Sequence, residues 1–189
     1  MIVRRFFVVA VVLAGLVAPA LPVRAQEMPT VRLGILDVGR ALQNASAVKG
    51  IRSQLSTYMD SYRADTQKEE QSLRSGQEEL VRKRAVLSAD AFAAERQKLE
   101  QRLAAAQAKV QDRRQSLERV HAEAMQKVQD VLANIVNTLA SERGLTLILR
   151  KDQTVYSAAS YEITDEVLKR LDKQLPSVKI GNPNTPAKK

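Results

Sequence analysis

The feature that most constrains the fold is a stretch of almost a hundred residues, 46–144, that contains no proline and is dominated by Ala, Gln, Glu, Lys, Arg and Leu. This composition is typical of long helices. Apolar residues recur in it at spacings of three and four, as in Val48, Ile51, Leu55, Tyr58 and Tyr62. Such narrow stripes favour coiled-coil packing over burial in a broad globular core.

A turn is predicted at residues 87–90. Ser88 can cap a second helix, Ser46 is the candidate N-cap of the first, and Gly144 supplies a left-handed stop. The two helices form an antiparallel coiled-coil hairpin, an arm over residues 46–143, whose first helix is about 63 Å long. The alternative, one unbroken rod of roughly 145 Å, is disfavoured because it separates the apolar segments at its two ends.

Short apolar runs flank the arm and predict strands at 31–38, 145–150 and 154–158. Asp37 is positioned to cap a short helix after the first strand, and Thr164 is the candidate N-cap of a final helix. The segment 176–189 is predicted to be a disordered tail. The fold class is therefore α+β, mainly α.

Size predicts self-association. The arm takes 98 of the 164 residues that follow a 25-residue leader, and the tail takes 14, so 52 remain for a body made of residues 26–45 and 144–175. A body this small cannot cover both faces of such apolar strands. We expect a homo-oligomer whose subunits share a small β-barrel. The residues expected in it are Leu33, Ile35, Leu36, Leu147, Ile148, Leu149 and Tyr156.

Residues 1–25 have the pattern of a secretory signal peptide. Arg4 and Arg5 precede an apolar run that ends in Val23-Arg24-Ala25, which predicts cleavage between Ala25 and Gln26. Interruptions by glycine and proline disfavour the alternative of an uncleaved membrane anchor. Export from the cytoplasm is expected.

Composition argues against catalysis and cofactor binding. The sequence has no cysteine, a single histidine (His121) and no glycine-rich phosphate loop, so no enzyme activity, cofactor or metal site is predicted. Loss of three leader arginines lowers 30 basic residues to 27 against 21 acidic ones, a net charge of +6. This charge suits anionic partners, but the few scattered aromatic residues give no platform for nucleic acid.

The chain resembles the Skp/OmpH family of periplasmic chaperones. The resemblance rests on a signal peptide, the opening ILDVGRALQNA, a long charged helical hairpin, then GLTLILRKDQTVYSA and the close ITDEVLKRLDK, the most specific part. It extends to Lys173, with Lys49-Gly50 in place of the reverse order expected in the family.

This resemblance implies a homotrimer with a shared β-barrel and three arms around a cavity. It implies a holdase that binds unfolded outer-membrane proteins without ATP, and contact with an anionic membrane surface or lipopolysaccharide. A static envelope coiled-coil adaptor or a basic protein that binds anionic polymers is the alternative.

Three features of the arm are candidates for function, each with a plain structural alternative. Tyr58, Met59 and Tyr62 are candidate client contacts or part of the helix seam. Gly76 is a candidate hinge or a tolerated glycine. The candidate basic tip for anionic surfaces is Arg82, Lys83, Arg84, Arg96 and Lys98, or these are ordinary charges at a helix end.

Overall fold

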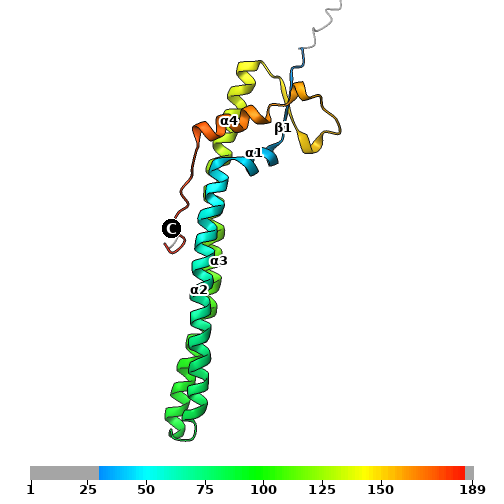
Figure 1. Cartoon of the computed structure of the whole chain (residues 1–189). Coiled ribbons are helices and arrows are strands. Elements are labelled where there is room, and N and C mark those ends of the chain that lie inside the picture. The colour runs from blue at the N-terminus through cyan, green and yellow to red at the C-terminus, as the bar shows by residue number, and fades with distance from the viewer. Residues whose placement is uncertain (1–29, 186–189) are drawn as a thin grey trace, which may run out of the picture. The chain divides into compact units, whose positions relative to one another are not determined.

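The structure is a computed structural model that describes residues 30–185. The predicted leader 1–25, including the cleavage point at Ala25 and Gln26, lies outside the described residues. From Val31 onward the chain is one folded unit, in which two long helices extend from a small mixed body (Figure 1).

The two long helices are α2 (Ser46–Lys83) and α3 (Ala89–Arg143), and they lie side by side as an antiparallel hairpin (Figure 1). Ser88 caps α3, with its hydroxyl oxygen accepting from the Ala91 amide at 3.3 Å. Gly144 ends α3 in the left-handed region, at φ 60°, where glycine has no steric penalty. The structure therefore has the hairpin rather than the rod, although the first helix ends at Lys83 rather than Leu87.

Two of the predicted helix caps are wrong. Ala45 occupies the N-cap of α2, and the backbone amide of Ser46 donates to the carboxylate of Asp172 at 2.7 Å. Thr164 is the first residue of α4 (Thr164–Gln174), and its buried hydroxyl accepts from the Asp37 amide at 3.0 Å. At α2 the distant Asp172 replaces the local side-chain cap, whereas the Thr164 hydroxyl serves the distant Asp37 amide and leaves α4 without a side-chain cap.

The body contains one sheet of two parallel strands, β1 (Leu33–Leu36) and β2 (Leu147–Arg150). Leu33 pairs with Leu147, and the whole arm is the connection between the strands. The predicted strand at 154–158 is not formed. Two 3₁₀ turns, η1 (Lys151–Gln153) and η2 (Ala159–Tyr161), flank an irregular loop there, because no strand of the same chain lies beside it to complete a ladder.

The core spans the body and the base of the arm. In the body, Asp37 caps α1 (Val38–Asn44) by accepting from the Arg40 amide at 2.8 Å, and α4 packs against α1 and α3. Leu36, Ile163, Val167 and Leu171 are buried in one cluster with Val48 and Ile51 of α2 and with Val128, Leu132, Ile135 and Leu139 of α3. The arm therefore closes the core of the body.

Residues 176–185, which fall in the segment predicted to be a disordered tail, lie along the arm. The tail segment, residues 176–185, runs beside α2 and α3 (Figure 1). Val178 is buried and belongs to the core cluster. None of the helices between residues 30 and 185 is long and apolar enough to span a bilayer.

Candidate functional site

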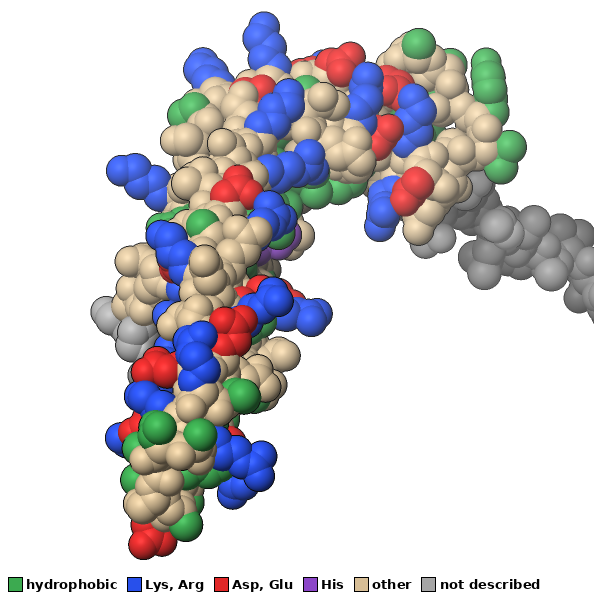
Figure 2. All heavy atoms as spheres, turned by 60° about the horizontal axis from the view of Figure 1, so that its bottom comes forward, with side chains coloured by type: hydrophobic (Ala, Val, Ile, Leu, Met, Phe, Trp, Pro, Cys, Tyr) green, Lys and Arg blue, Asp and Glu red, His purple; other side chains and the backbone are tan. Residues whose placement is uncertain are grey.

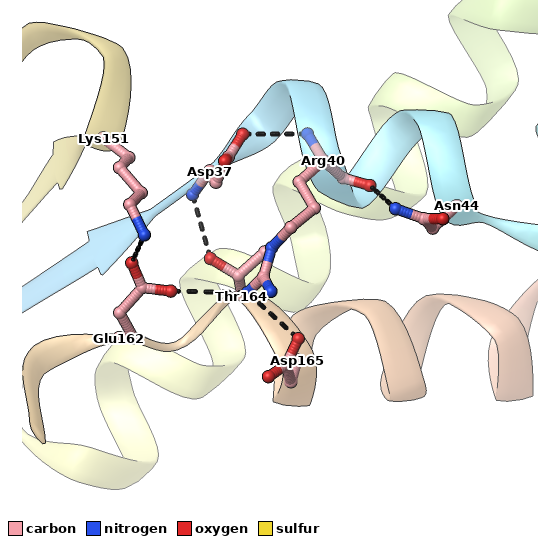
Figure 3. A network of polar contacts seen from close by, with 7 residues as sticks. All are labelled: Asp37, Arg40, Asn44, Lys151, Glu162, Thr164 and Asp165. Atoms are coloured by element: carbon pink, nitrogen blue, oxygen red, sulfur yellow. Dashed lines mark hydrogen bonds and ion pairs between the residues drawn. The ribbon is translucent and has the colours of Figure 1, made fainter. Parts of the chain in front are cut away.

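A network of charged groups holds the segments of the body together (Figure 3). The Arg40 guanidinium lies 3.3 Å from a carboxylate oxygen of Glu162 and 3.0 Å from one of Asp165. Lys151 pairs with the other oxygen of Glu162. These contacts join α1 to the loop after β2 and to α4. They fix the position of the loop after β2, whose apolar side chains are exposed to solvent.

The body leaves an apolar surface beside this network. Leu147 and Leu149 of β2 are 45% and 38% exposed, and Val155 and Tyr156 of the loop are 107% and 84% exposed. Of the residues expected in an oligomer interface, Ile35 and Leu36 are instead buried within their own chain, while Leu33 and Ile148 are half-buried. The exposed apolar surface of the body is therefore formed by β2 and the loop that follows it.

In the proximal half of the arm, Tyr62 lies between the two helices and the tail segment. Its ring is covered by the guanidinium of Arg113 at 4.4 Å, and its hydroxyl donates to the Asn184 side-chain oxygen at 2.8 Å. Only 8% of the residue is exposed, and burial raises the pKa of the phenol. Arg113 of α3 and the tail segment therefore cover Tyr62, and its contact with clients stays a prediction.

The neighbours of Tyr62 remain accessible. Tyr58 is half-buried, with its ring centroid 6.4 Å from that of Tyr62, and Met59 is 52% exposed. Met59 lines a shallow, mainly apolar groove of about 610 Å³ between the helices, together with Val110 and Leu117. The candidate client contact at this level is Met59 with the groove.

The distal half of the arm is packed far more loosely than its base. Between Arg63 and Arg119 no described side chain is buried. Leu103 and Val110, seven positions apart on α3, remain 48% and 45% exposed. The grooves continue along this seam, and Leu73, Leu80, Phe92 and Leu99 line them. An arm with this surface presents apolar groups without a fixed pocket.

Gly76 lies in this region, inside an unbroken α2. A methyl group added at Gly76 would come within 3.3 Å of Leu99 Cδ1, whereas one added at Gly50 meets nothing within 4 Å. Gly76 thus marks a point of close approach between the two helices of the arm.

The five cations of the predicted basic tip differ in their partners. Lys83 pairs with Glu79 at 2.7 Å, Lys98 with Glu95 at 2.8 Å and Arg96 with Glu100 at 3.4 Å. The hydrogen bonds from Lys83 and Lys98 lower the pKa of Glu79 and Glu95.

In the part of the chain that the structure describes, Arg82 and Arg84 have no carboxylate within 4 Å. On the face that Figure 2 shows, basic side chains are scattered along the molecule among acidic ones.

The residues from 30 to 185 contain no group of side chains arranged to hold a metal ion. His121 is exposed on α3. Sequence reasoning missed Arg113 and Gln54, which hold the seam and the tail segment. No local pattern marks either residue, because their partners lie 51 and 124 positions away.

The family model of the OmpH-like outer membrane proteins matches residues 32–171, from β1 to the buried Leu171 of α4. The chain belongs to the OmpH-like family. Membership confirms the family resemblance, and since OmpH-like proteins are chaperones and not enzymes, a chaperone role in the periplasm follows. The match ends before the tail segment.

The OmpH-like fold is also found in a solved structure. A crystal structure of a candidate outer membrane chaperone (OmpH-like) from Caulobacter crescentus aligns with 79% of this chain and 89% of that chain, with a TM-score of 0.74 and 20% sequence identity. At that identity the likeness shows the fold. Among curated protein sequences none matches the chain significantly.

Proposed function

We propose that this OmpH-like chain is an ATP-independent holdase that binds unfolded outer-membrane proteins in the periplasm and prevents their aggregation in transit. The observation that carries the proposal is the exposed apolar seam of the distal arm, where no side chain from Arg63 to Arg119 is buried. Exposed apolar grooves of this extent mark interaction surfaces. A shallow groove with adaptable side chains such as Met59 suits partners of varied sequence.

The proposal includes a homotrimer whose β2 strands and following loops form a shared barrel. The support is the exposed edge of a two-stranded sheet together with Leu147, Leu149, Val155 and Tyr156. An open sheet edge with exposed apolar side chains aggregates unless another strand pairs with it. Closure by two further copies would leave each arm free to border a cavity for the client.

The proposal also includes a contact of the arm tip with an anionic membrane surface or lipopolysaccharide. Since three of the tip cations pair with carboxylates of the same arm, we assign this contact to Arg82 and Arg84.

The test is an aggregation assay combined with a mass measurement on the mature chain. An unfolded outer-membrane porin diluted from urea should stay soluble when one trimer per porin is present without ATP, and sedimentation should give the mass of a trimer. Porin that aggregates equally fast with and without the protein would contradict the holdase function. A static adaptor would give that result.

A further inference from the structure

The tail segment is held by its backbone. The side-chain amide of Gln54 donates to the Val178 carbonyl oxygen at 2.8 Å and accepts from the Ile180 amide at 3.2 Å. Its second N–H donates to the Gly50 carbonyl oxygen at 3.1 Å, which orients the amide. Every extended polypeptide presents an amide and a carbonyl with this spacing. Gln54 therefore recognises an extended chain without regard to its sequence.

The apolar contacts of the tail segment also do not require a particular sequence. Val178 is 6% exposed and Pro183 is buried. At Gly181, between them, an added methyl group would lie 3.6 Å from Val120 Cγ1, an ordinary contact distance. The groove thus takes an apolar side chain at either end and has room for a side chain between them.

The groove does not end where the tail segment ends. Tyr62 and Arg119 bond to Asn184 and Thr185, at 2.8 and 3.1 Å. Beyond them a hollow of about 580 Å³ continues along α3 past Ser116 to Lys109. A longer extended chain would follow the same surface toward the loosely packed distal arm.

The groove lies within the family match, and its occupant lies outside it. Gln54, Tyr62, Arg119 and Val120 lie within the residues that match the OmpH-like family, whereas residues 176–185 lie outside that match. We propose that this groove is a binding site for extended segments of unfolded polypeptide, and that the chain's own tail fills it until a client displaces the tail. The inference rests on the proposed function for the identity of the occupant.

The first test uses the full mature chain and a labelled synthetic peptide of residues 176–189. Val178→Asp expels the tail from the groove, and Ser177→Asp adds the same charge at the exposed neighbouring position as a control. The peptide should bind Val178→Asp at least tenfold more tightly than it binds the wild type or Ser177→Asp. A further Gln54→Ala change should weaken this binding roughly tenfold, because two hydrogen bonds are lost.

Circular dichroism and sedimentation establish that Val178→Asp is folded. Ile180→Pro is a second, uncharged variant that removes the amide donor to Gln54 and should give the same result. If the wild type and both folded variants bind the peptide equally tightly, the groove is not a binding site that the tail fills.

The second test adds unfolded porin and follows hydrogen exchange of the Ile180 amide. Binding should abolish the protection of that amide in the wild type, and porin should compete with the peptide for Val178→Asp. If porin stays soluble while the Ile180 amide remains protected and the peptide remains bound, the displacement is overturned and the holdase function stands. If porin aggregates with every variant, both the holdase function and the displacement of the tail by clients are contradicted. The peptide result still decides whether the groove is a binding site.

Discussion

The guanidinium of Arg113 lies 4.4 Å from the centroid of the Tyr62 ring, and this contact closes the seam of the arm where the tail segment ends. Arg113 also donates to a carboxylate oxygen of Asp65 at 2.7 Å. Between this contact and the body, α2 and α3 contribute to the buried core. Between this contact and the tip of the arm, no described side chain is buried. The arm therefore changes from tight to loose packing at this pair.

Replacing Arg113 with Ala should lower the free energy of unfolding by about 1–2 kcal/mol, because the side chain is 15% exposed and a cation–π contact and an ion pair are lost together. Arg114→Ala is the control, since Arg114 is 75% exposed and pairs with Glu118 in the same helix. It should change stability by less than about 0.5 kcal/mol. Urea denaturation at one fixed protein concentration measures both, and equal effects would show that Arg113 does not close the seam.

Replacing Gly76 with Ala should stabilise the protein by less than the same change at Gly50. Alanine is favoured over glycine inside a helix by about 1 kcal/mol. The added methyl group meets no atom within 4 Å at Gly50. At Gly76 it would lie only 3.3 Å from Leu99 Cδ1, so the Leu99 side chain must move. Thermal unfolding ranks the two variants. If Gly76 is a hinge, spin labels at the tip of Gly76→Ala should also show a narrower distribution of arm positions, and an unchanged distribution would count against the hinge.

Ser88→Ala and Ser46→Ala should differ although both serines stand at helix starts. The Ser88 hydroxyl oxygen accepts from the Ala91 amide, so its loss should cost about 1 kcal/mol. Ser46 uses its backbone amide to reach Asp172, and alanine keeps that amide. Urea denaturation of Ser46→Ala should therefore match the wild type. A loss for Ser46→Ala as large as that for Ser88→Ala would contradict the capping described here.

Val155→Asp should reduce the mass in solution from a trimer toward a single chain. Val155 is 107% exposed in one chain, so the substitution has no reason to unfold that chain, but an aspartate in a shared barrel would be buried without a partner. Val86→Asp, at a position 80% exposed near the arm tip, is the matched control and should remain trimeric. Sedimentation at several concentrations distinguishes the two, and a trimeric Val155→Asp would place the subunit interface elsewhere.

Changing Arg82 and Arg84 together to Gln should weaken binding to vesicles that contain anionic lipid, by roughly fivefold for each charge removed at low salt. Lys68 and Lys127, both exposed and elsewhere on the arm, provide a control with the same change in net charge. Co-sedimentation at two salt concentrations measures the effect. Binding that falls equally in the control would show that net charge matters and the tip does not.

Local chemistry in the sequence was enough to predict the elements of the arm. A proline-free run with narrow apolar stripes predicts two long helices, and Ser88 and Gly144 mark a start and a stop because a cap acts on amides or carbonyls of the adjacent turn. Asp37 follows the same rule. The hairpin, the flanking strands β1 and β2 and the family resemblance depend on such short-range signals.

Only the tertiary structure shows which hydrogen-bond partners from distant segments replace the expected local ones. Asp172 takes the amide at the start of α2, Thr164 takes that of Asp37, and Gln54 orders the tail segment, each across more than a hundred residues. Tyr62 is buried for the same reason. Such a contact forms only because the packed core brings two distant segments together. The pattern of neighbouring residues in the sequence does not indicate which segments these are.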